Sequence, residues 1–157
     1  MKPLVYLETS VISYLTARPS RDVITLAMQR TTHEWWRTAR DKFDLVVSDL
    51  VLLEASAGDP RAAQLRLERT AAIRVALTTD ASRRLTEAIM RETSLPKTAE
   101  ADAAHIAIAA TNRADYLMTW NLRHIAAAVH RRGIQSACGA AGLVAPTICT
   151  PGELFGG

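Results

Sequence analysis

The feature that most constrains this fold is the alternation of short apolar runs with longer segments of helical periodicity. Strands are expected at residues 3–7, 44–48, 73–77, 115–119 and 146–149. Helices are expected at residues 11–15, 22–40, 50–57, 61–70, 80–93 and 99–112, with two more after the fourth strand, one ending at residue 132 and one at residues 135–140. Apolar strands separated by helices are typical of parallel sheets. The pattern therefore predicts an α/β protein with a mostly parallel sheet of four or five strands.

The length and composition predict one domain, spanning residues 1–157. Hydrophobic residues make up 48% of the chain, but no apolar run reaches the roughly 18 to 20 residues of a membrane span, and the N-terminus lacks a signal-peptide pattern. We therefore expect a cytoplasmic protein with no membrane association. The two cysteines, Cys138 and Cys149, have neither metal-type nor C-x-x-C spacing, so we expect them to be buried apolar residues.

The basic residues are mostly arginine, which contributes 16 of the 19 positive side chains in a chain of net charge +3. The planar guanidinium group suits phosphate and stacks on bases, which favours a nucleic-acid partner. Solvated helix faces and a GC-rich genome produce the same excess, so the composition leaves both explanations open.

Polar side chains follow the predicted strands at four places. Glu8, Thr9 and Ser10 come directly after the first strand, Glu54 lies on the helix after the second, and Asn121 follows the fourth. The fourth place is Asp102, on the helix that leads to the fourth strand. Ligands of open parallel sheets gather beyond the carboxyl ends of the strands, so these residues are the candidates for a functional site.

Asp102 lies in E-A-D-A-A-H-I-A-I-A-A, which predicts a helix buried on nearly all sides. A carboxylate in such a helix is costly unless a cation meets it. Helix geometry places Glu100 about 200° round the axis from Asp102, whereas His105 shares the face of Asp102. Only one of the two acids should therefore point inward.

Each of these polar residues also has a structural explanation. Glu8 can pair with an arginine, Thr9 or Ser10 can cap the next helix, Glu54 can be solvated, and Asn121 can cap the helix that follows it. Taken together, acids at several strand ends provide the oxygen ligands that Mg²⁺ or Mn²⁺ requires.

The chain resembles the PIN domain family, and within it the VapC-like toxins of type II toxin-antitoxin pairs, in the order and spacing of four motifs. The motifs are Y-L-E-T-S, V-S-D-L-V-L-L-E-A-S, A-D-A-A-H-I-A-I-A-A and Y-L-M-T-W-N-L-R-H-I, and they cover almost the whole chain. The resemblance implies a three-layer α/β/α fold and a metal-dependent endoribonuclease that leaves 5′-phosphate and 3′-hydroxyl ends. It also implies an RNA substrate, a cognate antitoxin and a homodimer.

Carried over by motif, the catalytic positions are Glu8, Glu54, Asp102 and Asn121, and the metal ligands are Glu8, Glu54 and Asp102. The family usually has Asp at the first position, where this chain has Glu8, and many relatives have Asp where it has Asn121. Three carboxylates still support one Mg²⁺ or Mn²⁺ ion. A sub-lineage with Glu in the first motif and Trp-Asn in the last is similar to this chain.

Further residues surround these positions in the sequence. Contacts to the ligands or to the substrate are expected from Thr9, Ser10, His105, Thr119 and Arg123. His105 is also explained as a hydrogen-bonded core histidine, and His124 as a residue that orders its loop. Arg113 and Arg123 can contact phosphate groups or pair with acidic side chains. Of Trp35 and Trp36, which face different sides of one helix, one should be in the core and the other is available for a dimer or antitoxin interface.

Three other classes of function are alternatives to the nuclease. A degenerate PIN fold that binds RNA or a protein without cutting is favoured by Glu8 and Asn121. An enzyme with an acid nucleophile usually needs paired aspartates after the first strand, which are missing here. Nucleotide-cofactor enzymes are disfavoured because the seven glycines form neither G-x-G-x-x-G nor a Walker A sequence.

Overall fold

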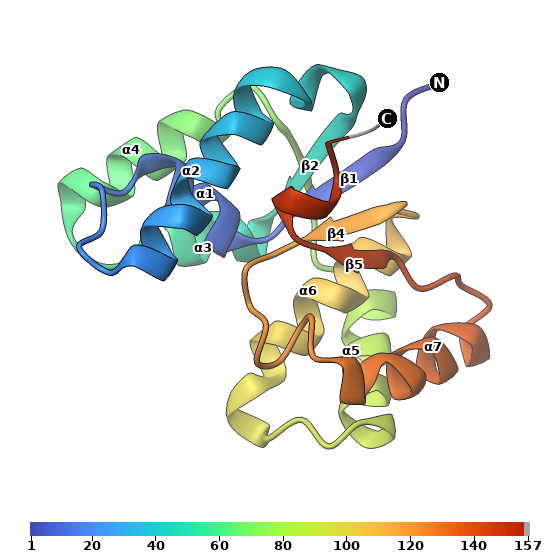
Figure 1. The fold of residues 1–157 in the computed structure, drawn as a ribbon. Coiled ribbons are helices and arrows are strands. Elements are labelled where there is room, and N and C mark those ends of the chain that lie inside the picture. The colour runs from blue at the N-terminus through green and yellow to red at the C-terminus, as the bar shows by residue number, and fades with distance from the viewer. Residues whose placement is uncertain (156–157) are drawn as a thin grey trace.

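The protein is a three-layer α/β/α structure built on a parallel sheet, seen in a computed structural model that describes residues 1–155 (Figure 1). The five strands of the described residues are β1 (Leu4–Leu7), β2 (Asp44–Ser48), β3 (Arg74–Ala76), β4 (Tyr116–Met118) and β5 (Thr147–Cys149). Their order in the sheet is β3-β2-β1-β4-β5, and every neighbouring pair is parallel. The predicted fold class is confirmed.

Within residues 1–155, seven α-helices cover the sheet. They are α1 (Thr9–Thr16), α2 (Val23–Thr38), α3 (Asp49–Ala55), α4 (Pro60–Thr70), α5 (Asp80–Glu92), α6 (Glu100–Thr111) and α7 (Arg131–Ala140). Helix α1 packs against α2, α3 and α4, while α5 packs against α6 and α7, so the helices form two groups on opposite sides of the sheet (Figure 1). The described part of the chain also contains four short 3₁₀ segments, at Arg40–Lys42, Lys97–Ala99, Ala128–His130 and Pro151–Glu153.

The strand order creates a point where the chain reverses direction across the sheet. From β1 the chain moves outward to β2 and β3, and it then returns to place β4 on the other side of β1. Right-handed crossovers put the connecting helices on opposite faces before and after such a reversal. The gap beyond the carboxyl ends of β1 and β4 is therefore the topological switch point, where ligands of open α/β sheets bind.

The central strands are buried on both faces, as their continuous apolar sequences require. Val5, Tyr6 and Leu7 of β1 are fully buried, as are Val46 and Val47 of β2. No helix within residues 1–155 has the length and apolar character to cross a membrane. Cys138 and Cys149 are free and buried, which confirms their assignment as packing residues.

One local prediction is wrong. The segment after β4 is not a helix ending at residue 132, and α7 instead spans Arg131–Ala140. The backbone N–H groups of Trp120 and Asn121 donate to the side chains of Ser10 and Thr119 at 2.8 and 2.9 Å, which holds this segment in a loop.

Replacing Gly133 by alanine is expected to destabilise the protein by roughly 1–3 kcal/mol through overpacking. Gly133 lies in α7, and a Cβ added there would come within 2.1 Å of the backbone oxygen of Glu92 at the end of α5. Gly139 is a matched control in the same helix, since a Cβ there would meet nothing within 4 Å. Gly139→Ala should be neutral or stabilising by up to about 1 kcal/mol, and urea unfolding of both variants measures the difference. Equal unfolding midpoints would contradict the close packing of α7 on α5.

Candidate active site

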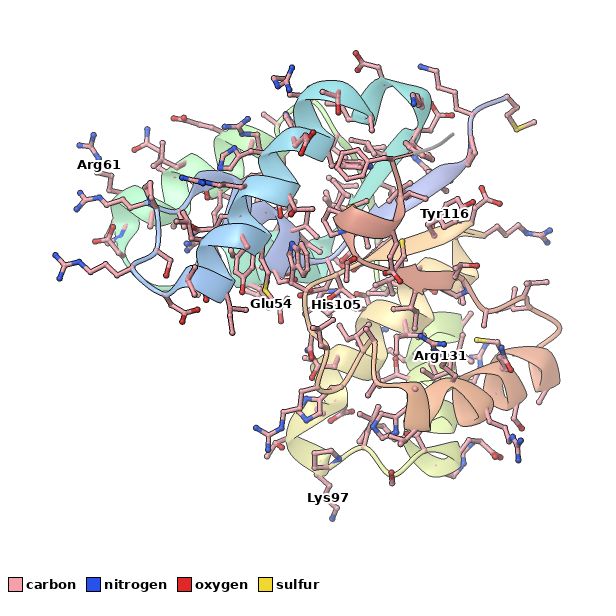
Figure 2. The ribbon with its side chains drawn as sticks, in the orientation of Figure 1. Glu54, Arg61, Lys97, His105, Tyr116 and Arg131 are labelled. Atoms are coloured by element: carbon pink, nitrogen blue, oxygen red, sulfur yellow. The ribbon has the colours of Figure 1, made fainter. Side chains whose placement is uncertain are left out.

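The candidate site lies at the switch point and draws side chains from strand ends and from helices on both sides of the sheet. Glu8 follows β1, Thr119 follows β4, Glu54 lies on α3, and His105 lies on α6. Figure 2 labels Glu54 and His105 next to each other between the two groups of helices, and the carboxylate Oε1 of Glu54 lies 2.7 Å from Nε2 of His105.

Glu8 is held rigidly by its neighbours. It is 6% exposed, and its Oε1 accepts hydrogen bonds from Ser10 Oγ at 2.5 Å and from Thr119 Oγ1 at 2.7 Å. Its Oε2 accepts from the backbone N–H of Ser10 at 3.2 Å, so Glu8 itself is the N-cap of α1. The expectation that Thr9 or Ser10 is the cap is wrong, because both hydroxyl groups bind site carboxylates instead.

Glu54 is oriented by a hydroxyl and an imidazole. Its Oε1 accepts from Thr9 Oγ1 at 2.5 Å and lies in contact with His105. Burial raises the pKa of Glu54, but the hydrogen bonds from His105 and Thr9 and the electrostatic effect of His105 outweigh it, so the net pKa is below its ordinary value. Glu54 is therefore ionised at neutral pH and belongs to this cluster, which excludes its description as a merely solvated helix residue.

A carboxylate oxygen on each acid retains capacity for another ligand. In Glu8 and Glu54 the Oε1 atom already accepts two hydrogen bonds, which fills its two lone pairs. Within the described residues, no hydrogen bond reaches Oε2 of Glu54, and only the Ser10 N–H reaches Oε2 of Glu8. The hydroxyl donors are in turn fixed, because Ser10 Oγ and Thr119 Oγ1 accept from backbone N–H groups.

This donor set fits a divalent cation. One ligand atom from each of Glu8, Glu54 and His105 lies within 4.8 Å of the other two. Two carboxylates at this separation repel each other unless a cation or proton lies between them. Carboxylate oxygens are the ligands that Mg²⁺ and Mn²⁺ prefer.

Asp102 forms a second group beside the first. Its Oδ1 accepts from Asn121 Nδ2 at 3.1 Å, its Oδ2 lies 2.9 Å from His124 Nδ1, and the Asn121 Oδ1 accepts from the His124 N–H at 3.0 Å. The backbone N–H of Asn121 donates to Thr119, which connects this group to Glu8. The cluster of possible metal ligands consists of Glu8, Glu54 and His105 and does not include Asp102. The role of Asp102 as a metal ligand therefore stays a prediction.

The two acidic residues of α6 lie on different faces of the helix, as expected. Glu100 is exposed and Asp102 is partly buried, which confirms that only one of them points inward. His105 is fully buried and hydrogen bonded, as predicted for a core histidine, yet its partners include a site acid. His124 orders its loop, as expected, and also contacts Asp102.

Sequence reasoning missed Tyr6 and Ser48, which lie behind the site. Tyr6 Oη lies 2.7 Å from His105 Nδ1 and 2.7 Å from Ser48 Oγ. Burial, with a smaller effect of Glu8 and Glu54, raises the pKa of Tyr6 far above its ordinary value, so its hydroxyl keeps its proton. The available signal was a tyrosine inside a wholly apolar strand, because a buried tyrosine hydroxyl needs a partner.

The predicted arginines lie at the surface. Arg113 and Arg123 are both exposed, and Arg113, two residues after the end of α6, has the left-handed conformation with φ of 56°. Neither is among the residues that hydrogen bond to the acids within the described part of the chain. Their assignment as phosphate contacts stays a prediction.

Comparison with known proteins identifies the fold. No family model matches the sequence, and no curated protein matches it. Among solved structures, VapC20 of Mycobacterium tuberculosis, a toxin that cleaves the sarcin-ricin loop, is similar with a TM-score of 0.59 and 19% identity, over 80% of this chain and 95% of that one. VapBC2 of Rickettsia felis, solved with a DNA fragment from its promoter, has a TM-score of 0.54 and 13% identity, over 78% of this chain and 91% of its own. The chain therefore has the PIN-like α/β/α fold that these VapC structures share.

Proposed function

We propose that this protein is a divalent-metal-dependent endoribonuclease and the toxin of a toxin-antitoxin pair. The observation that carries the proposal is the Glu8 and Glu54 pair at the switch point, held so that each acid keeps an oxygen available. Similarity of fold to VapC20, an RNA-cleaving toxin, supports the same substrate class.

The proposed roles follow from the contacts of each residue. Glu8 and Glu54, with Asp102 beside them, would hold Mg²⁺ or Mn²⁺, and Asn121 orients Asp102. A bound ion would supply an activated water and neutralise charge on the scissile phosphate. Thr9, Ser10 and Thr119 hold the carboxylates in place, and the exposed Arg123 is the candidate for contact with the RNA backbone.

The location, the oligomeric state and the protein partner proposed here follow from the resemblance to VapC-like toxins. We place the protein in the cytoplasm, as one domain of residues 1–157 that forms a homodimer and is inhibited by a cognate antitoxin. Trp36 is partly buried beside Arg40 and Arg69, whereas Trp35 is fully buried. This agrees with a core role for Trp35 and leaves Trp36 available for a protein partner.

Cleavage of structured ribosomal RNA by the antitoxin-free protein tests the proposal. Cutting is expected with Mg²⁺ or Mn²⁺ and none with EDTA, and Asp102→Asn should lower the rate roughly 100-fold or more because it removes a charge from the metal site. Glu100→Gln is the matched control on the exposed face of α6 and should cut like the wild type. If the folded wild type neither cuts RNA nor gains thermal stability from Mn²⁺, the protein is a binding module with a degenerate site.

A further inference from the structure

Four polar side chains form a continuous row from the protein core to the candidate site. The row runs from Ser48 at the end of β2, through Tyr6 in β1 and His105 in α6, to Glu54 in α3. Each contact in it spans 2.7 Å, and Ser48, Tyr6 and His105 are fully buried. Buried polar groups in such a row must each find a partner, so the direction of every hydrogen bond is constrained.

The direction can be followed from the backbone outward. The N–H of Val51 donates to Ser48 Oγ at 3.1 Å, which leaves the Ser48 hydroxyl proton to be donated to Tyr6 Oη. Tyr6 then donates its own proton to Nδ1 of His105. An imidazole that accepts at Nδ1 carries its proton on Nε2, and that proton points at the Glu54 carboxylate.

The opposite direction leaves a buried group without a partner. If Nδ1 of His105 carried the proton, it would donate to Tyr6, and Tyr6 would donate to Ser48. Ser48 Oγ would then accept twice, and among the described residues its own proton would have no remaining acceptor. In addition, an unprotonated Nε2 would place its lone pair 2.7 Å from a carboxylate oxygen, which is repulsive.

We propose that His105 is a positioning residue which donates its Nε2 proton to Glu54, and that Ser48 and Tyr6 hold the imidazole in the tautomer that does so. Glu54 Oε1 is then fully occupied by His105 and Thr9, and Oε2 is the atom left for the ion. This inference rests on the proposed function, because it assigns His105 to the outside of a metal site and not to the ligand set.

The alternative is a site with one nitrogen ligand, since a ring nitrogen of His105 lies within 4.8 Å of a carboxylate oxygen of each acid. The two arrangements differ in metal preference. An all-oxygen set accepts Mg²⁺ and Mn²⁺, whereas an imidazole ligand shifts preference toward transition metals such as Zn²⁺. A direct view of the histidine nitrogens separates them.

Nitrogen NMR of the metal-free protein at neutral pH, labelled with ¹⁵N-histidine, tests the tautomer without reference to activity. We expect His105 to carry a proton on Nε2 and none on Nδ1. Tyr6→Phe should shift the Nδ1 resonance of His105, because that nitrogen loses its hydrogen-bond donor, whereas Tyr116→Phe on the half-buried face of β4 should leave the His105 signals unchanged. A wild-type His105 with a proton on Nδ1 would overturn the proposal.

Pulsed EPR of the Mn²⁺-bound labelled protein tests the ligand set. We expect no directly coordinated histidine nitrogen, and we expect Tyr6→Phe to weaken Mn²⁺ binding by about 10-fold, as for other residues that orient metal ligands. A coordinated nitrogen that persists in His124→Asn would come from His105 and overturn the proposal, as would unchanged Mn²⁺ affinity in Tyr6→Phe. If the wild type binds no Mn²⁺ and cuts no RNA, the proposed nuclease fails, and the NMR tautomer alone still decides whether His105 is a donor to Glu54.

Discussion

Replacing Glu54 by glutamine is expected to make the metal-free protein somewhat less stable than the wild type, and to abolish its stabilisation by Mn²⁺. The amide oxygen can still accept from Thr9 and His105, so the local hydrogen bonds survive. These hydrogen bonds favour the ionised carboxylate, as the lowered pKa of Glu54 indicates, so they become weaker when the charge is removed. The same change removes the Oε2 charge that the proposed ion requires.

Thermal unfolding with and without Mn²⁺ measures this effect. At a Mn²⁺ concentration about 100-fold above its Kd, the wild type should gain about 2.7 kcal/mol of unfolding free energy, and Glu54→Gln should gain almost none. RNA cleavage should fall roughly 100-fold or more in the same variant. Glu87→Gln, at an exposed position of α5, is the charge-matched control and should retain both properties. Full stabilisation of Glu54→Gln by Mn²⁺ would remove Glu54 from the metal site.

Replacing Trp35 by alanine is expected to cost about 3–5 kcal/mol of unfolding free energy. Trp35 is fully buried, and its ring stacks on Phe43 with centroids 6.0 Å apart. Its Nε1–H donates to the backbone oxygen of Leu154 at 2.7 Å, which ties the C-terminal segment to α2. The substitution therefore creates a cavity and leaves a buried carbonyl without its donor. A loss of this size is a large part of the 5–15 kcal/mol that stabilises a typical domain.

Trp36 provides the comparison for this substitution. It is partly buried, and the Arg40 guanidinium lies 4.3 Å from its ring centroid. An exposed cation–π contact contributes only about 0.5–1 kcal/mol, so Trp36→Ala should lose about 1 kcal/mol. Urea unfolding followed by far-UV circular dichroism compares the two variants without depending on tryptophan fluorescence. Equal losses would contradict the assignment of Trp35 to the core and Trp36 to its edge.

The elements of the fold were predictable because their signals are local. Residues 44–48 form the predicted second strand, and α5, which Thr79 caps, spans Asp80–Glu92 of the helix predicted at residues 80–93. Such features depend on residues a few positions apart, through apolar periodicity and capping hydrogen bonds. The loop after β4 was misread because its backbone N–H groups bind side chains of other elements, and no local pattern records those contacts.

The candidate site was predictable only in outline. Acids at the ends of parallel strands indicated where Glu8 and Glu54 would meet, since the carboxyl ends of such strands share one edge of the sheet. Helical geometry correctly separated Glu100 from Asp102. It also put His105 on the face of Asp102, but the two side chains bind different partners. His105 contacts Glu54. Asp102 contacts Asn121 and His124.

The sequence by itself determined the buried parallel strands, the helices between them and the acids placed at their ends. Only the tertiary structure decided which donor meets which carboxylate oxygen, and it brought Tyr6 and Ser48 into the description of the site. The physical reason is that a hydrogen bond requires its two heavy atoms within about 3 Å and in good alignment. Thr119 and Glu8 are 111 residues apart in the chain, and His105 and Glu54 are 51 apart, so their contacts follow from the packing of whole elements and not from any local pattern.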